Sequence, residues 1–235
     1  MSDLAIIAIR PEPGLAKTLA RARAMGLPVA GHPLFRVAPV AWDAPDSAEF
    51  DGLLLGSGNA VRHAGPAIGR YAALPVHAVG DDTAAAARAA GLRVATVGEG
   101  GLQPVLDTLS AASGGGVRLR LLRLAGRARV PLHPPPAITL ATRVVYVVTG
   151  EVLSPALVEA LARGAVVLLH SGEAAAHFSR ECDRAEVRRD RIGVAALAPR
   201  VAERAGAGWR AAGVADRPDD AALLALAARM CKEQG

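Results

Sequence analysis

The sequence predicts an α/β protein made of two similar lobes, each with a parallel sheet flanked by helices. Two unbroken apolar runs, residues 53–55 and 166–169, are typical of strands that are buried on both faces of a parallel sheet. Each run is followed by a Ser-Gly turn and a helix-forming segment, and in both places the order strand, helix, strand then continues. This loose repeat indicates two lobes rather than one large sheet.

The composition fits two small domains with an anionic partner. A chain of 235 residues exceeds a typical single domain of roughly 100 to 150 residues. The net charge of +5 favours a nucleic acid or a small polyacid as the partner. Only 3% of the residues are aromatic, and no Lys/Arg block alternates with aromatic residues, which argues against nucleic acid. The alternative for any single arginine is that it only solvates a helix face.

Other classes of protein are excluded in the same way. Cys182 and Cys231 are isolated and lack metal-ligand spacing, so we expect neither a metal site nor a disulfide framework. His63 and His177 occupy matching places in the repeat, but no second ligand follows at i+4 on either helix. We expect no signal peptide, and no apolar run approaches the ~20 residues that span a bilayer. The sequence therefore predicts a cytoplasmic protein without a metal.

The first elements are a buried strand at residues 4–9 and a helix from about residue 15 to Gly26. Arg10 follows the carboxyl end of this strand. Ligands of open α/β sheets bind at that edge, so Arg10 is a candidate anion contact, or else a surface arginine. Residues 27–40 are strand-like but contain three prolines, which favours an edge strand or a connector, and we place the first crossing between the lobes there.

Several turns lead from a strand into a helix. Ser57 and Ser171 are predicted N-caps, because their hydroxyls can accept from a backbone N–H group in the first turn. Pro199 and Arg200 open a helix after the strand 192–196. Helix starts of this kind present free N–H groups to an anion.

Gly80 to Thr83 forms a further turn, between the strand 76–79 and the helix 84–90. Its helix start is again a candidate anion site. The alternative is that Asp81, Asp82 and Thr83 only cap the helix, and the two carboxylates would repel an anionic ligand.

A cluster of arginines follows in the middle of the chain. The segment Gly98-Glu99-Gly100-Gly101 lacks the spacing of a nucleotide-binding loop, so no nucleotide is predicted. A helix from residue 102 is followed by a strand at residues 117–124. Arg123 lies at the end of this strand, and Arg127 and Arg129 follow closely after it. Such a cluster suits several carboxylates or phosphates, unless it is a solvated loop. The Pro-rich residues 131–136 are predicted to be extended.

Tyr146 lies on a predicted strand at residues 142–148 that runs back to the first lobe. It is either a packed core tyrosine with a satisfied hydroxyl or a catalytic proton donor. A helix then starts at Ser154-Pro155. The last predicted helix, residues 219–230, has acidic residues at its positive end.

Short motifs occur in order along nearly the whole chain. They are IRPE at 9–12, GLPV at 26–29, PLF at 33–35, DGL at 51–53, SGNAV at 57–61, VHAVG at 76–80, VVY at 144–146, LLHSG at 168–172 and PDD at 218–220. In this order and spacing the chain resembles the uroporphyrinogen-III synthase family of heme biosynthesis.

The resemblance implies two Rossmann-like lobes joined by a two-stranded linker. One lobe would comprise residues 1–36 plus 149–235 and the other residues 37–148, with linker strands near 34–40 and 142–148. The substrate, the linear polycarboxylate hydroxymethylbilane, would bind in the cleft between the lobes without a cofactor. We expect a monomer that binds neither nucleic acid nor membrane.

The resemblance also implies a lyase reaction. Loss of the substrate's hydroxyl as water gives an azafulvene, the substituted carbon of the last pyrrole ring attacks it, and a spiro intermediate fragments and recloses with that ring inverted. Orientation is the protein's main task, and a proton donor would assist the leaving hydroxyl. Tyr146 matches the family's tyrosine on the returning strand and is the candidate acid. The candidate substrate-binding residues are Arg10, Ser57, Gly58, Asn59, Gly80, Thr83, Arg123, Ser171, Gly172, Pro199 and Arg200.

Two departures from the family pattern accompany the resemblance. The family usually has a helix where this chain has the Pro-rich residues 131–136, and many members have a Thr-containing turn where this chain has Ala198-Pro199-Arg200. The main alternative function is a non-enzymatic two-lobed module that binds or senses a small anion, which the fold alone does not exclude.

Overall fold

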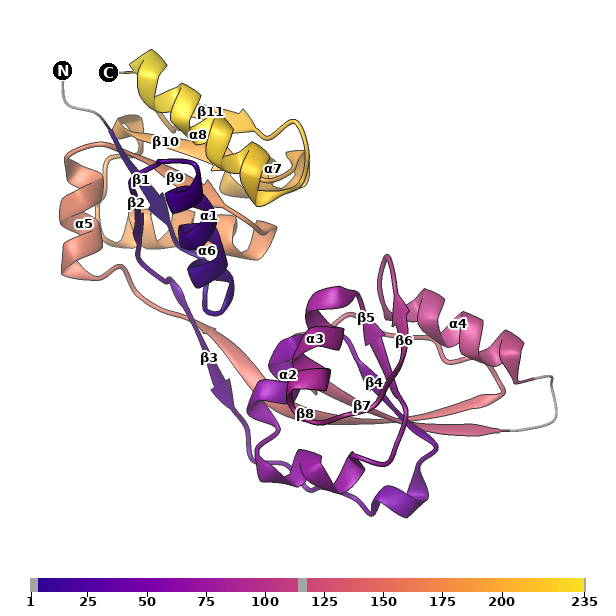
Figure 1. The fold of residues 1–235 in the computed structure, drawn as a ribbon. Helices are drawn as coiled ribbons and strands as arrows, with labels where there is room; N and C mark the ends of the chain where they lie inside the picture. Colours follow the sequence, from indigo (N-terminus) through magenta and orange to yellow (C-terminus); the bar gives the residue numbers. More distant parts are fainter. Residues whose placement is uncertain (1–3, 114–117, 235) are drawn as a thin grey trace. The chain divides into compact units, whose positions relative to one another are not determined.

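The computed structural model describes residues 4–113 and 118–234. Its internal contacts divide the chain into two compact units: unit 1, residues Met1–Arg36 and Thr149–Gly235, and unit 2, residues Val37–Val148. The chain passes from one unit to the other within two strands, β3 (Phe35–Pro39) and β8 (Ile138–Gly150) (Figure 1). Unit 1 is therefore discontinuous in sequence.

Unit 1 contains a five-stranded sheet in the order β11-β10-β9-β1-β2, in which every neighbouring pair is parallel. Its strands are β1 (Ala5–Ala8), β2 (Val29–Gly31), β9 (Ala165–Leu169), β10 (Ile192–Ala196) and β11 (Ala211–Val214). Its helices are α1 (Gly14–Ala24), α5 (Pro155–Ala162), α6 (Gly172–Arg184), α7 (Pro199–Ala205), α8 (Asp220–Gln234) and the short 3-10 helix η3 (Arg189–Arg191).

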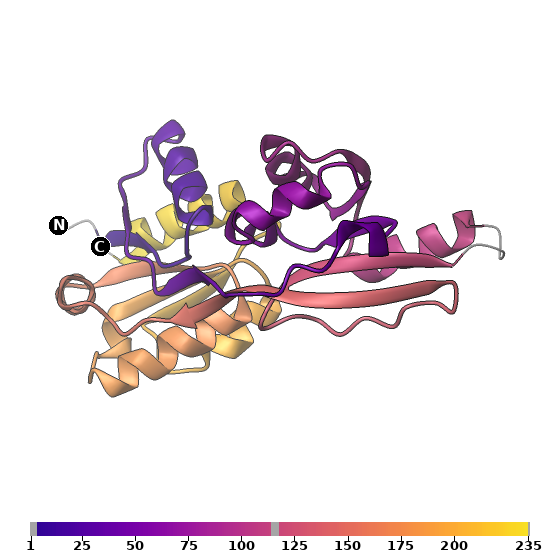
Figure 2. The same ribbon diagram turned by 90° about the horizontal axis from the view of Figure 1, so that it is seen from below.

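The two faces of this sheet are covered by different helices. Along β1 and just beyond it, Ile7 and Ile9 belong to the core formed with α5, α6 and α7, whereas Ile6 and Ala8 belong to the core formed with α1 and α8. This alternation follows from the period of two in a strand. Figure 2 shows the layers, with α1 in indigo and α8 in yellow on one side of the sheet and α6 in orange on the other. The continuous apolar run of β9 is buried because helices cover both faces.

Unit 2 contains a six-stranded sheet in the order β3-β8-β7-β4-β5-β6. The strands from β8 to β6 are parallel. The Val40 N–H donates to the Val145 carbonyl and the Glu151 N–H donates to the Leu34 carbonyl, so β3 runs antiparallel to β8. The remaining strands are β4 (Gly52–Leu55), β5 (Val76–Val79), β6 (Val94–Gly98) and β7 (Leu119–Gly126).

Helices also cover both faces of the sheet in unit 2. The helices α2 (Gly58–His63), α3 (Asp81–Ala89) and η2 (Pro66–Tyr71) pack with Leu53 and Leu55 on one face. The helix α4 (Leu102–Ala112) packs with Leu54 on the other face. A short 3-10 helix, η1 (Ser47–Glu49), precedes β4. The predicted fold class, parallel sheets flanked by helices in two lobes, is thus confirmed.

The predicted internal repeat is confirmed as well. In one copy β4 leads through Ser57 into α2, and in the other β9 leads through Ser171 into α6. The Ser57 hydroxyl accepts from the Asn59 N–H at 3.2 Å, and the Ser171 hydroxyl accepts from the Ala174 N–H at 3.2 Å. Both serines are the N-caps that the sequence predicted.

Two elements differ from the sequence-based expectation. The strand β7 ends at Gly126, beyond the predicted end at Leu124, and Arg123 lies within the strand as predicted. Val117, where this strand was predicted to begin, lies outside the described residues. The helix α3 is capped by Gly80, whose φ of 82° suits glycine, with no side-chain cap hydrogen bond at that position.

The connection between β7 and β8 is a crossover without a helix. Parallel neighbouring strands need a crossover connection, which is usually a helix. Here the described residues 127–137 contain no helix and no strand, as predicted for the Pro-rich residues 131–136. We call residues 127–137 the crossover strap. In the part of the chain that the structure describes, no helix has the length and apolarity to cross a membrane.

Candidate active site

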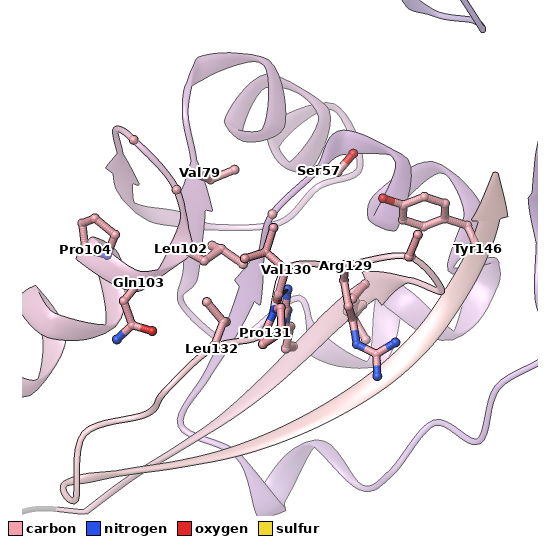
Figure 3. A pocket seen from close by; sticks show the side chains of 18 residues that line it. Ser57, Val79, Leu102, Gln103, Pro104, Arg129, Val130, Pro131, Leu132 and Tyr146 are labelled. Atoms are coloured by element: carbon pink, nitrogen blue, oxygen red, sulfur yellow. Dashed lines mark hydrogen bonds between the residues drawn. The ribbon is translucent and has the colours of Figure 1, made fainter. Parts of the chain in front are cut away.

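A cavity of about 370 Å³ lies in unit 2 at the carboxyl ends of β4, β5 and β7 (Figure 3). Its walls are the ends of these strands, the first turn of α4, Tyr146 on β8, and residues 128–132 of the crossover strap. The carboxyl edge of a parallel sheet is where α/β proteins bind ligands. A cavity of this size accommodates a small organic group.

The crossover strap is held against α4 by hydrogen bonds and by packing. The Gln103 amide donates to the His133 carbonyl at 3.0 Å and accepts from the His133 N–H at 2.9 Å. Leu132 packs against the apolar cluster of Leu102 and Leu106 on α4. These contacts fix the strap as a wall of the cavity.

Tyr146 lies beside Gly126, its register partner on β7. A Cβ atom at Gly126 would lie 2.7 Å from the Tyr146 Cζ and 2.9 Å from its hydroxyl oxygen, so the ring occupies the space that a side chain at this position would need. Tyr146 is 9% exposed, and its hydroxyl points into the cavity on the side where Ser57 lies (Figure 3).

The two tyrosines of the chain differ in what their hydroxyls do. The Tyr71 hydroxyl donates to the Pro45 carbonyl at 2.7 Å, and the residue is fully buried. Among the described residues the Tyr146 hydroxyl has no hydrogen-bond partner, and it faces the cavity. Unlike a packed core tyrosine with a satisfied hydroxyl, Tyr146 therefore offers a hydrogen-bond donor to the cavity.

Arg123 does not lie in a solvated loop, which was one of the two alternatives for the arginine cluster. Its position on β7 leaves it only 7% exposed, and it lines the cavity. Its Nη2 donates to the Val130 carbonyl of the strap at 3.0 Å, whereas its Nε is buried without a hydrogen-bond partner. Burial lowers the pKa of Arg123, the nearby charge of Arg129 lowers it further, and Tyr146 opposes this shift.

Two further groups at the cavity are hydrogen-bond donors. The first turn of α4 begins at Gly101, which has no side-chain cap, and contains no acidic residue. Arg129 lies at the rim, where its Nη1 donates to the Arg127 carbonyl at 3.0 Å. Among the described residues, none that lines the cavity is acidic. The cavity therefore suits an anionic group.

Four further predicted residues of unit 2 lie outside this cavity. Gly58 is buried at the start of α2, and the Asn59 side chain accepts from Arg62 at 3.1 Å. Gly80 forms the N-cap of α3, and Thr83 is 4% exposed within that helix. Of the predicted binding residues in unit 2, the structure brings only Ser57 and Arg123 together with Tyr146 at one cavity.

In unit 1, Arg10 takes part in a charge cluster at the carboxyl end of β1. Its Nη1 lies 3.2 Å from Asp220 Oδ1, and Asp220 also accepts from the Thr18 hydroxyl at 2.8 Å. His170 Nε2 lies 3.1 Å from the same carboxylate. The hydrogen bond with His170 is the largest cause that lowers the pKa of Asp220, to about 2. The Arg10 charge is thus already paired.

The remaining predicted residues of unit 1 lie where α6 approaches α7. Ser171 caps α6, and a Cβ atom at Gly172 would lie 3.7 Å from the Arg200 carbonyl oxygen and 2.9 Å from Arg204 Cγ. Pro199 is the first residue of α7. The structure therefore brings Gly172 and Arg200 together.

Sequence reasoning missed Gln103 and the strap residues at the cavity. Their contacts join positions 30 residues apart, so no local pattern marks them. One signal was present: Gly100 and Gly101 have φ values of 75° and 120° and line the cavity, although their spacing excluded a nucleotide loop. Across residues 4–113 and 118–234, no group of three or more His, Cys, Asp or Glu side chains is arranged to hold a metal ion.

Comparisons with known proteins identify one family and similar solved structures. The family model described as "Uroporphyrinogen-III synthase HemD" matches residues 16–225. A crystal structure of uroporphyrinogen-III synthetase from Helicobacter pylori is similar with a TM-score of 0.65 and 15% identity, over 97% of this chain and 99% of that one. A mutant uroporphyrinogen III synthase from Thermus thermophilus gives a TM-score of 0.50 and 16% identity, over 98% and 100% of the two chains. A comparison with curated protein sequences gave no match. The similarity to solved structures supports the fold, and the match to the family model shows the family.

Proposed function

The chain belongs to the uroporphyrinogen-III synthase family, and we propose that it cyclises hydroxymethylbilane to uroporphyrinogen III, with inversion of the last pyrrole ring and loss of water. The reaction makes it a lyase of tetrapyrrole biosynthesis. The observation that carries the proposal beyond the family match is the Tyr146 hydroxyl, which is free of protein partners among the described residues and faces a cavity lined by donors.

Tyr146 is the proposed general acid. The leaving hydroxyl of the substrate must depart as water, and a phenol within hydrogen-bond reach can supply the proton. His63 lies next to Tyr146, with ring centroids 6.2 Å apart, and burial lowers the pKa of His63, which favours its neutral form.

The substrate is a polycarboxylate, and the cavity offers donors and positive charge to match it. Ser57 and Arg123 are the proposed contacts at the cavity. The other proposed substrate contacts in unit 2 lie at its strand-to-helix turns and are Gly58, Asn59, Gly80 and Thr83. The proposed contacts from unit 1 are Arg10, Ser171, Gly172, Pro199 and Arg200.

The electrophilic azafulvene is reactive by itself, so the protein must chiefly orient it and prevent direct closure without inversion. A site built on strand ends, with a strap held by hydrogen bonds and packing, suits that task, because it fixes the positions of its donors. We also propose that the protein acts as a cytoplasmic monomer that binds no nucleic acid. The net charge of +5 combined with the scarcity of aromatic residues supports a small polyacid as the partner.

The proposal is tested by adding the purified chain to freshly generated hydroxymethylbilane, then oxidising the products and separating the type I and type III uroporphyrin isomers. An excess of type III over the protein-free control is expected. A folded sample that yields only the type I isomer would contradict the proposal and support a module that binds anions without turnover.

A further inference from the structure

Arg123 is a buried cation without a buried counter-charge. The side chain projects from β7 at the cavity and is 7% exposed. Among the described residues no carboxylate forms an ion pair with it, and its only protein acceptor is the Val130 carbonyl at 3.0 Å. Its Nε is enclosed and has no hydrogen-bond partner.

Such an arrangement is unfavourable for the free protein. A buried charge that lacks a counter-charge loses hydration that a single carbonyl does not replace. A buried donor left unsatisfied destabilises the folded protein, and more so when it belongs to a charged group. Nearly all buried polar groups in folded proteins have partners, so an exception of this kind at a cavity calls for a functional explanation.

The surroundings of Arg123 define the chemistry of the missing partner. The start of α4 adds the positive end of a helix dipole with no acidic residue in its first turn. Leu102, Leu124 and Leu132 supply apolar wall. The cavity volume of about 370 Å³ suits one substituted aromatic ring rather than a chain of four.

We propose that this cavity is a subsite for a single pyrrole ring of the substrate, and that Arg123 is the counter-charge for one carboxylate carried by that ring. The carboxylate accepts from the Arg123 guanidinium and supplies the missing counter-charge. The assignment of this carboxylate to the tetrapyrrole substrate rests on the proposed function.

Gln103 is the positioning residue of this subsite. Its two hydrogen bonds to His133 hold the strap that carries Val130 and Leu132. The strap in turn fixes the Val130 carbonyl, which orients the Arg123 guanidinium through Nη2.

The test measures binding rather than turnover, so that it stands apart from the isomer assay. The probe is a monopyrrole with one acetate and one propionate side chain, titrated calorimetrically into the full chain, and its dimethyl ester is the uncharged comparison. The wild type should bind the acid and not the ester. Arg123→Met should weaken binding of the acid at least tenfold.

Arg120→Met is the matched control, since Arg120 lies on the same strand but is half exposed and paired with Asp51. It should bind the acid as the wild type does. Arg123→Met removes an uncompensated charge and is expected to fold. If it does not, Arg123→Lys replaces it: Lys keeps the charge but lacks Nε and the planar fork, so it should also weaken binding. Gln103→Ala should weaken binding less than either variant. Asp107→Ala removes a second acceptor of the Gln103 amide, at 3.0 Å, but neither of the two hydrogen bonds between Gln103 and His133, so it should leave binding unchanged.

The outcomes separate the two claims. Equal binding of the acid by the wild type and the Arg123 variant that folds overturns the subsite, whatever the isomer assay gives. Displacement of the acid by inorganic phosphate at equal concentration overturns its specificity for a carboxylate. Arg123-dependent binding without type III product supports the subsite and contradicts the synthase reaction.

Discussion

The ring of Tyr146 lies against the backbone of Gly126, at the end of the neighbouring strand. A Cβ atom at Gly126 would come within 2.7 Å of the Tyr146 ring, closer than a packed structure allows. The ladder between β7 and β8 shifts its register between Ala125 and Gly126, and the Arg127 N–H then donates to the Tyr146 carbonyl at 3.0 Å. The absence of a side chain at Gly126 therefore sets where the proposed acid stands.

Gly126→Ala is expected to displace the Tyr146 ring and to reduce type III formation at least tenfold. The glycine has a φ in the range open to all residues, so the effect is steric and not a backbone strain. Gly69→Ala is the control, because a Cβ atom there meets nothing within 4 Å. Steady-state rates and thermal melts of both variants decide the matter: equal activity of Gly126→Ala and the wild type would contradict the placement of Tyr146.

Asp220 is expected to stabilise unit 1 in a way that depends on pH. Its folded-state pKa of about 2 lies below the roughly 3.9 of an unfolded aspartate, so its ionised form contributes about 2 kcal/mol above pH 4. This contribution is lost as the pH falls from 4 towards 2. Asp220→Asn should therefore be less stable than the wild type at pH 7, and the difference should shrink in that window. Urea unfolding of the wild type and Asp220→Asn, at pH 7 and at pH values between 4 and 2, measures the difference in their free energies of unfolding. A difference that stays constant with pH would contradict the assignment.

Ser171 should contribute to stability as the N-cap of α6. Ser171→Ala removes the acceptor for the Ala174 N–H and should lower the free energy of unfolding by about 1 kcal/mol. Ser171→Asp offers another capping oxygen and should restore most of it. Ser154→Ala, at the cap of α5, should cost a similar amount and leave the activity unchanged. Activity lost in Ser171→Asp despite restored stability would show that the hydroxyl also contacts the substrate.

Most of the fold was predictable because its signals are local. A buried parallel strand needs apolar residues on both faces, and the run Leu53 to Leu55 shows that in the sequence itself. The capping role of Ser57 is equally local, since the accepting Ser57 hydroxyl and the donating Asn59 N–H group lie two residues apart. Repetition of both signals near residue 170 indicated the second unit.

The candidate site was only partly predictable because its parts meet through the tertiary structure. Arg123 was placed in the predicted strand 117–124, but no local pattern shows that its side chain is buried at a cavity, because the strap that closes this cavity comes from later in the chain. Gln103 is an unremarkable residue of a helix start until the strap brings His133 to it. Tyr146 was found through its strand, but the state of its hydroxyl depends on the cavity around it.

The central claim is that Tyr146, and not Tyr71, supplies the proton at the cavity. The most direct measurement is the single-turnover rate of type III formation by Tyr146→Phe and Tyr71→Phe, each with its melting temperature. Tyr146→Phe should melt like the wild type and react about 10² to 10⁴ times more slowly. Tyr71→Phe should lose about 1 kcal/mol of stability with its hydrogen bond to Pro45 and keep its rate. A Tyr146→Phe variant with the wild-type rate would contradict the account.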